Sequence, residues 1–305
     1  MLFKPQGCGF FVVLSRGANG AVYFLYMVDI TKASGEREPF DRTKLCDSLR
    51  MAHAPEDVVA HVCALVEQDI QPGATTSYLF RKATRHLMKA NPAVAARYNL
   101  KRGIAELGPA GFFFEQFLEV MLKEMGYETE RNRIMKGRCV EHEVDVVAHG
   151  KDEHYLIEAK YHNSPHLRTH VDVVMYADAR LQDISEEPTR KREGVRHGMW
   201  LITNTKFTHT AIQYAQCRGL TLTGWRYPKD NGLEDLIAKH VLYPVTALPS
   251  VNPYVRHIFA KYDMMLVRDL AVYSEDDLVK KFEIHRPVAR GIIREAHALI
   301  YGDAV

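Results

Sequence analysis

The chain has 305 residues, of which 47% are hydrophobic and 26% charged, with a formal net charge of +2. This composition excludes a mainly disordered chain, and the balanced charge gives no bulk electrostatic indication of a nucleic-acid partner. No apolar run reaches the length of a membrane span, so we expect no membrane contact. Five scattered cysteines without a C-x-x-C pair argue against a disulfide framework or structural zinc, and favour a cytoplasmic location.

The first third of the chain is predicted to be mostly helical. Residues 1–27 are expected to be an N-terminal extension, and residues 31–40 form a turn-rich stretch. Four helical patterns follow, at residues 41–54, 55–69, 75–90 and 92–107. Asp41 and Thr75 are expected to be helix N-caps, and the Gly108-Pro-Ala-Gly111 segment indicates a hinge.

The middle of the chain alternates between helical and strand patterns. A helix with paired apolar residues ends at Gly126, and two strand-like runs separated by a polar turn predict a hairpin. Ser164-Pro165 is expected to start the next helix, as N-cap and first residue. The ranges, in order, are 112–125, 140–148, 154–161, 164–183, 199–203, 208–218 and 220–224, and short helices follow over 248–305. This order predicts an α/β domain with a mixed sheet.

The hairpin carries three charged residues that can support phosphate chemistry. Glu158 and Lys160 share one face of their strand because side chains alternate, and the partner strand can bring Asp145 beside them. Two carboxylates with water are the ligands Mg²⁺ prefers, and a nearby lysine can orient or deprotonate an attacking water. The alternative is a cross-strand ion pair on a solvated face. The apolar flanking residues favour the metal site, since buried charges are costly without a ligand.

Asp145-x12-Glu158-x-Lys160 resembles the signature of the PD-(D/E)xK nucleases, and its flanks resemble the Mrr-type restriction endonucleases. The flanks are Gly111-Phe-Phe-Phe-Glu115 and Trp200-Leu-Ile-Thr203, followed by a helix and a strand. The resemblance implies hydrolysis of double-stranded DNA with Mg²⁺ or Mn²⁺, held by Asp145, Glu158 and Glu115. It also implies a homodimer or higher homo-oligomer, because cutting a duplex needs two active sites. For Glu115 the alternative is a solvent-facing helix charge.

Polar and basic residues after Lys160 are candidates for DNA contact. His162 and Asn163 follow the strand directly, and His166 and His170 are spaced for one face of the expected helix. Arg190, Lys191 and Arg192 form a basic cluster that predicts a phosphate clamp, with a solvated loop as the alternative. A zinc site at the histidine pair is the weaker interpretation.

The segment 28–107 resembles the ATP-cone, a regulatory nucleotide-binding module of ribonucleotide reductases and NrdR-type repressors. The resemblance rests on Val28-Asp-Ile-Thr-Lys32 with Phe40-Asp41-x-x-Lys44-Leu45, on Gly73-Ala-Thr-Thr76 and on Ala95-Ala-Arg97-Tyr98. It implies ATP or dATP as effector, with Lys32 and Lys44 facing the phosphates and Thr76 donating a hydroxyl. The alternative is a small helical domain without ligand.

We therefore expect an ATP-cone over 28–107, a nuclease core over 108–245 and a helical module over 246–305. The last module resembles helix-hairpin-helix or SAM-like domains, but its turn Glu283-Ile-His-Arg286 lacks the glycine of the DNA-binding forms, which favours packing or dimerisation. The function expected is cleavage of foreign or modified DNA under nucleotide control. Two alternatives stay open: a nucleotide-responsive DNA-binding regulator without cleavage, and a structure-selective repair or junction nuclease.

Overall fold

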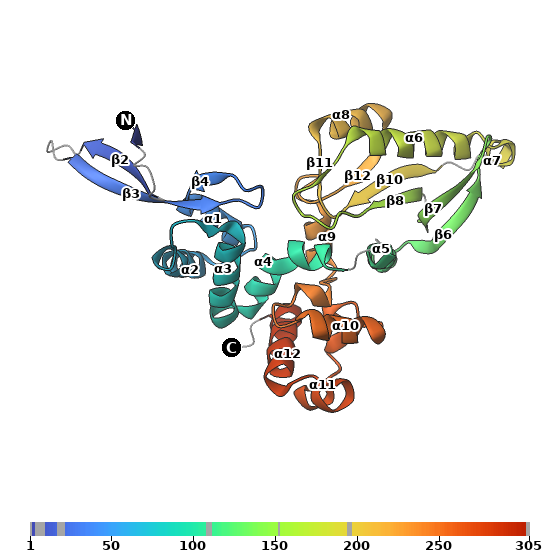
Figure 1. The fold of residues 1–305 in the computed structure, drawn as a ribbon. Helices are drawn as coiled ribbons and strands as arrows, with labels where there is room; N and C mark the ends of the chain where they lie inside the picture. The colour runs from blue at the N-terminus through green and yellow to red at the C-terminus, as the bar shows by residue number, and fades with distance from the viewer. Residues whose placement is uncertain are drawn as a thin grey trace. The chain divides into compact units, whose positions relative to one another are not determined.

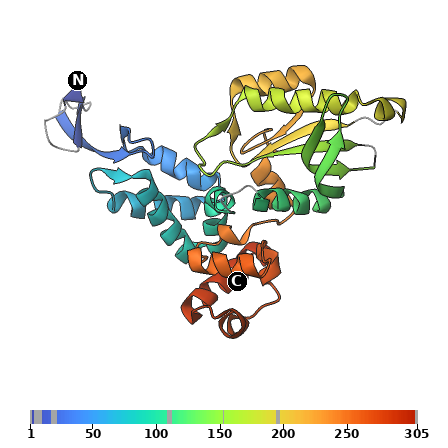
Figure 2. The ribbon, with the colours of Figure 1, turned by 45° about the vertical axis from the view of Figure 1, so that its right-hand side comes forward.

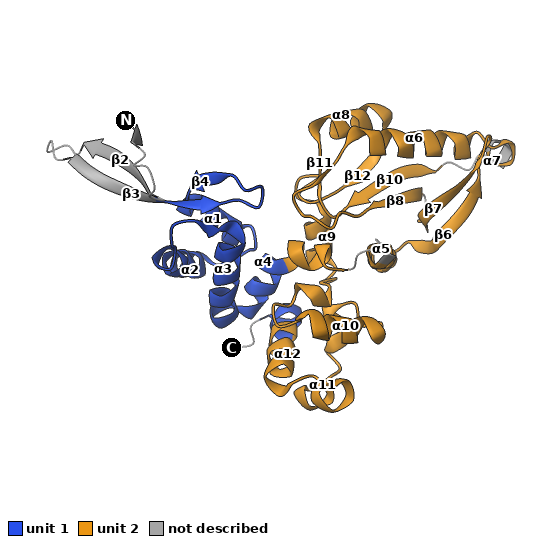
Figure 3. Cartoon of the chain, viewed as in Figure 1, with its two compact units in different colours: residues 1–99, 297–305 blue, residues 100–296 orange. Residues whose placement is uncertain are grey.

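The computed structural model describes residues 2–3, 10–16, 22–107, 112–151, 153–193 and 197–302. Two compact units divide the chain: residues 1–99 with 297–305, and residues 100–296 (Figure 3). This division differs from the boundaries expected from the sequence, because helix α4 (Pro92–Ala105) supplies residues to both units.

The first unit combines a small sheet with helices. Strand β3 pairs antiparallel with β2 and β4 and parallel with β5, and it runs across residue 28, where the sequence suggested a domain start. The side chains of Asp41 and Thr75 cap α1 and α3, which confirms both expected N-caps. The elements are β1 (Leu2–Phe3), β2 (Phe10–Arg16), β3 (Val22–Thr31), β4 (Arg37–Pro39), α1 (Arg42–Arg50), α2 (Glu56–Gln68), β5 (Ala74–Thr75) and α3 (Thr76–Ala90).

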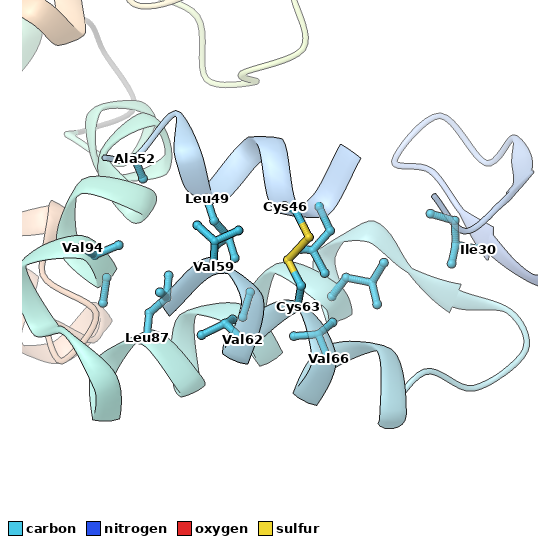
Figure 4. Close-up of a cluster of buried hydrophobic side chains, with 14 residues drawn as sticks. Ile30, Cys46, Leu49, Ala52, Val59, Val62, Cys63, Val66, Leu87 and Val94 are labelled. Carbon is cyan, nitrogen blue, oxygen red and sulfur yellow. A yellow bond between two sulfur atoms is a disulfide. The ribbon is translucent and has the colours of Figure 1, made fainter. Parts of the chain in front are cut away.

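A core of aliphatic side chains holds α1, α2 and α3 together (Figure 4). Leu49, Val62 and Leu87 are fully buried in it. Cys46 and Cys63 form a disulfide within this core, with 5.9 Å between their Cα atoms. The expectation of no disulfide is therefore wrong for this pair, because packing of α1 on α2 brings together two cysteines 17 residues apart.

The second unit is built on a five-stranded mixed sheet with the order β12-β10-β8-β7-β6. β6, β7 and β8 pair antiparallel, whereas β10 runs parallel to both β8 and β12. The expected hairpin is confirmed as β7 with β8. The strands are β6 (Glu128–Lys136), β7 (Glu141–His149), β8 (His154–Lys160), β10 (Gly198–Thr203) and β12 (Thr221–Thr223). The first of them, β6, was not expected from the sequence.

Helices cover both faces of this sheet. Helices α6 (Val171–Ser185) and α8 (His209–Arg218) lie side by side on one face, and α5 (Phe112–Glu124) lies on the other (Figure 1, Figure 2). The apolar contact between the sheet and α6 includes Leu156, Val174 and Leu201, all nearly inaccessible to water. Burial of such side chains is the main stabilising contribution to this α/β unit.

The helix after β8 begins later than the sequence suggested. Residues 164–167 form a turn closed by the N–H of Leu167 on the carbonyl of Ser164, and Arg168 and Thr169 form a short strand, β9. β9 pairs parallel with β11 (Lys206–Phe207), so this stretch is extended until α6 starts at Val171. The predicted helix start at Ser164-Pro165 is therefore wrong, and His166 and His170 are not both on a helix.

The last part of this unit, from residue 248 on, is helical, as expected. Ser274 caps α11, with its hydroxyl accepting from the N–H of Asp277 at 3.1 Å. Ion pairs Arg256–Glu106 and Arg268–Glu124 attach this part to the ends of α4 and α5. The remaining helices are α7 (Pro188–Glu193), α9 (Leu233–Lys239), α10 (Pro253–Lys261), α11 (Glu275–Phe282) and α12 (Arg286–Tyr301), with short 3₁₀ helices Val245–Ala247 and Val267–Leu270; the end of α12, from His297 on, belongs to the first unit. Within the described residues no helix is long and apolar enough to cross a bilayer.

Candidate active site

Asp145 lies where the regular pairing of the sheet is interrupted. The register of β7 with β8 ends at Val146 and Ile157, and one step further Asp145 faces Glu158. β6 is the neighbour of β7 on the other side, and there Asn132 lies opposite Asp145 without forming a regular strand pair. The φ angle of Asn132 is 51°, which is outside the range of a strand. The Asp145 carboxylate accepts a hydrogen bond from the backbone N–H of Ala159 at 2.7 Å. This bond fixes the carboxylate at the point where β7 and β8 separate.

Glu158 and Lys160 lie on the neighbouring strand, β8, with alternate spacing. The Glu158 side chain is 17% exposed and forms an ion pair with Arg180 of α6. Lys160 is close enough for its positive charge to act on the carboxylates of both Asp145 and Glu158, and the two carboxylates also affect one another. The structure therefore brings together the three residues that the sequence singled out.

The electrostatics of this corner disfavour two negative charges. Burial, and then the negative charge of Asp145, raises the pKa of Glu158 to about 7. Burial likewise raises the pKa of Asp145, against the opposing effect of the Ala159 hydrogen bond. Two desolvated carboxylates facing each other are expensive unless a cation joins them. The donor set thus fits a divalent ion.

Glu115 of α5 lies near enough to Asp145 for the two carboxylates to affect one another. Its helix, α5, buries Phe114, Phe117 and Leu118. Burial, and then the negative charge of Asp145, raises the pKa of Glu115. Among the described residues no three His, Cys, Asp or Glu side chains are already arranged around an ion position. Asp145 and Glu158 with water are a sufficient oxygen set for Mg²⁺, with Glu115 as a neighbouring third carboxylate.

Arg180 is a site residue that sequence analysis missed. It projects from α6 onto the Glu158 carboxylate, is 12% exposed, and its guanidinium carbon lies 5.0 Å from the centre of the Tyr176 ring. The sequence signal is the i, i+4 spacing of Tyr176 and Arg180 on the helix after the Glu158-x-Lys160 strand. That signal becomes specific only once the crossing of α6 over β8 is known.

The expected DNA-contact residues lie in two separate segments, the bend after β8 and helix α7. The backbone of His162 exchanges two 2.8 Å hydrogen bonds with the Asn204 side chain, and Asn163 is exposed in the bend beside it. Arg190 lies at the opposite end of α6, on α7, where its guanidinium donates to the carbonyl of Lys136. Lys191 and Arg192 are on the same helix, and their side chains lie outside the described residues.

Two of the expected nucleotide residues of the first unit, Lys32 and Lys44, lie around one carboxylate. The Nζ atoms of Lys32 and Lys44 lie 2.9 Å and 3.2 Å from the Glu38 carboxylate. Thr76 is the first residue of α3, directly after the capping Thr75. Both lysines can therefore reach a common anionic group.

Comparison with known proteins gives this geometry a family context. A restriction-endonuclease family model, of the Mrr catalytic type, matches residues 109–224. An uncharacterized protein of Archaeoglobus fulgidus is 37% identical over 183 residues, which are 59% of this chain and 98% of the relative. A crystal structure of a protein of unknown function, AF1548, is 35% identical with a TM-score of 0.49, and covers 63% of this chain and 100% of that chain. A crystal structure of protein VC1899 from Vibrio cholerae is 14% identical with a TM-score of 0.28, over 64% of this chain and 50% of that chain.

Proposed function

The chain belongs to the family of the Archaeoglobus fulgidus protein and carries an Mrr-type restriction-endonuclease domain, and from this premise we propose that it is a metal-dependent endonuclease of foreign or modified double-stranded DNA. The observation that carries the proposal is the corner formed by Asp145, Glu158 and Lys160, where β7 and β8 separate. Desolvated carboxylates of raised pKa beside a lysine are typical of a metal-assisted hydrolytic site.

Asp145 and Glu158 are the residues that would hold Mg²⁺ or Mn²⁺, with Glu115 able to join them. A bound divalent ion supplies Lewis-acid neutralisation of the scissile phosphate and a more acidic water. The Ala159 N–H keeps the Asp145 carboxylate aimed at the corner. Arg180 holds the Glu158 carboxylate until a cation competes for it.

Lys160 is assigned to the attacking water. It is the last residue of β8 and half-buried beside the two carboxylates. An ammonium group in this position donates a hydrogen bond to the water and stabilises negative charge that develops on the phosphate. Removing a group that acts on the transition state costs on the order of 10²-fold or more in rate.

The test is a plasmid digestion with Mg²⁺, comparing the natural chain with Lys160→Ala and with Lys261→Ala, an exposed lysine on the last turn of α10. We expect cleavage that is abolished by EDTA, reduced by about 10²-fold or more in Lys160→Ala, and unchanged in Lys261→Ala. Full cleavage by Lys160→Ala would overturn the mechanism.

The DNA substrates separate the remaining alternatives. Methylated and unmethylated plasmids and a four-way junction are digested in parallel. Preference for modified plasmid supports the restriction role, and preference for the junction indicates a structure-selective repair nuclease. Binding of DNA without any cleavage in Mg²⁺ or Mn²⁺ would identify a regulator that retains the fold.

We also propose that the first unit binds ATP or dATP as an effector. The supporting observation is the convergence of Lys32 and Lys44 on Glu38, because triphosphate oxygens could replace that carboxylate between the same two ammonium groups. Isothermal titration of ATP and dATP tests it, with Lys32→Ala expected to weaken binding. Gel filtration with and without nucleotide tests coupling to a homodimer, and an unchanged mass and cleavage rate would remove the coupling.

A further inference from the structure

Four basic side chains from separate segments gather beyond the end of β8. Arg168 on β9 and Lys206 on β11 are register partners of a parallel strand pair. Arg226 follows Trp225, whose N–H donates to the carbonyl of Thr205 at 2.7 Å, which places Arg226 beside Lys206. Lys101 of α4 donates to the carbonyl of Pro165 at 2.9 Å and lies 5.8 Å from the centre of the Trp225 ring. We call Lys101, Arg168, Lys206 and Arg226 the basic cluster.

The basic cluster lacks the carboxylates that would neutralise it. Within the described part of the chain none of its four members makes a salt bridge, whereas Arg131, Arg180 and Arg256 each pair with a glutamate. One carboxylate lies nearby, Glu234, which accepts the backbone N–H of Arg226. Four cations against one carboxylate leave a net positive charge at this point.

Burial and mutual repulsion both lower the pKa values of the two lysines of the basic cluster. Burial, and then the positive charges of Lys206 and Arg226, lowers the pKa of Lys101 to about 8. Burial, and then Arg226 and Arg168, also lowers the pKa of Lys206. Lys101 and Lys206 are half-buried, so cations placed beside them cost free energy unless an anion binds there.

The basic cluster is continuous with the candidate active site. β8 ends at Lys160 and β10 ends at Thr203, and these two residues are register partners. The loops that leave the two strands carry Arg168 and Lys206, and they are joined by hydrogen bonds between Thr169 and Thr203 and between His162 and Asn204. Cations placed along one edge in this way suit the regularly spaced phosphates of a nucleic-acid strand.

We propose that the basic cluster binds backbone phosphates of the DNA on one side of the scissile bond. This proposal rests on the proposed nuclease function, whose residues it does not include. Phosphate contacts of this kind position the duplex without reading its sequence. Free phosphate and ATP carry the same anionic groups as the DNA backbone. The thermal stabilisation that each of them gives is therefore measured as well, for the natural chain and the variants.

The experiment measures binding of a fluorescently labelled 20-base-pair duplex by anisotropy, in EDTA, over a series of salt concentrations. The full chain is compared with Arg168→Ala/Lys206→Ala and with the control Lys261→Ala/Lys280→Ala, which removes two exposed lysines of the C-terminal helices. Loss of two phosphate contacts should reduce the slope of log affinity against log salt by about 2 and weaken binding roughly tenfold or more at low salt. The control should match the natural chain.

Several outcomes would overturn the proposal. An unchanged salt slope in the double variant would do so, whether or not the protein cleaves DNA in Mg²⁺. Unchanged duplex binding, together with loss of the thermal stabilisation given by inorganic phosphate or ATP, would identify a small phosphate ligand instead. A lowered urea midpoint, in Arg168→Gln/Lys206→Gln as well as in the alanine variant, would show that the cations hold the fold. If the natural chain does not cleave DNA in Mg²⁺ and the salt slope of the double variant is reduced, the nuclease function is overturned and the DNA contact stands.

Discussion

Replacing Glu158 by glutamine removes the charge that the fold accommodates least well at the candidate site. Burial and the neighbouring Asp145 raise the pKa of Glu158 from the ordinary 4.5 to about 7. A tenfold change in an ionisation constant corresponds to about 1.4 kcal/mol, so ionised Glu158 costs about 3 kcal/mol of folding free energy. Because the carboxylate is 17% exposed, solvent screens this cost only weakly. Glutamine is nearly isosteric and stays neutral at every pH.

The direction in which stability changes with pH follows from proton linkage. In the folded state the pKa of Glu158 lies above its unfolded value, so the contribution of Glu158 to stability is fully present below pH 4.5, and about 3 kcal/mol is lost as the pH rises through 7. Glu158→Gln is therefore expected to match the natural chain near pH 4 and to exceed it by about 3 kcal/mol at pH 8.

Urea unfolding at pH 4.5 and pH 8, followed by tryptophan fluorescence, measures this difference. Both tryptophans, Trp200 and Trp225, lie in residues 100–296, so the signal reports the unit that contains Glu158. Glu141→Gln, an exposed glutamate on β7, is the control and should change stability by about 0.5 kcal/mol or less. Equal or lower stability of Glu158→Gln at pH 8 would refute the argument that this carboxylate is strained by burial.

Other consequences of the same geometry can be measured. Initial cleavage rates at fixed Mg²⁺ should rise with pH through about 7, because Glu158 must lose its proton to serve as a ligand, and a flat profile from pH 5.5 to 8.5 would contradict this. Arg180→Met removes the guanidinium that competes for Glu158, so calorimetry at pH 8 should show roughly tenfold tighter Mg²⁺ binding. Asn204→Ala deletes two hydrogen bonds to the His162 backbone and should lower stability by about 2 kcal/mol in urea unfolding.

Short-range signals in the sequence predicted much of the scaffold. The caps at Asp41 and Thr75 act within one helical turn, and both are observed. The alternation in β8 and the polar turn before it define the hairpin that brings Asp145 to Glu158. The same patterns missed β6, because its residues are mostly charged and exposed, with a single buried side chain, Met135.

Contacts between segments far apart in the chain decided the start of α6 and the partner of Glu158. Whether Ser164-Pro165 starts a helix depends on β9 pairing with β11, almost forty residues later in the chain, and that pairing prevails over the local capping signal. The ion pair of Arg180 with Glu158 depends on where α6 crosses the sheet.

Local signals in the chain were sufficient for the helix caps and the acidic hairpin, because their causes act between residues close in sequence. Tertiary structure decided the disulfide between Cys46 and Cys63, the counter-ion of Glu158, and the gathering of Lys101, Arg168, Lys206 and Arg226. Such groups come from segments whose separation along the chain says nothing about their distance in space. Their energies depend on burial and on neighbouring charges, which exist only once the helices have packed on the sheet.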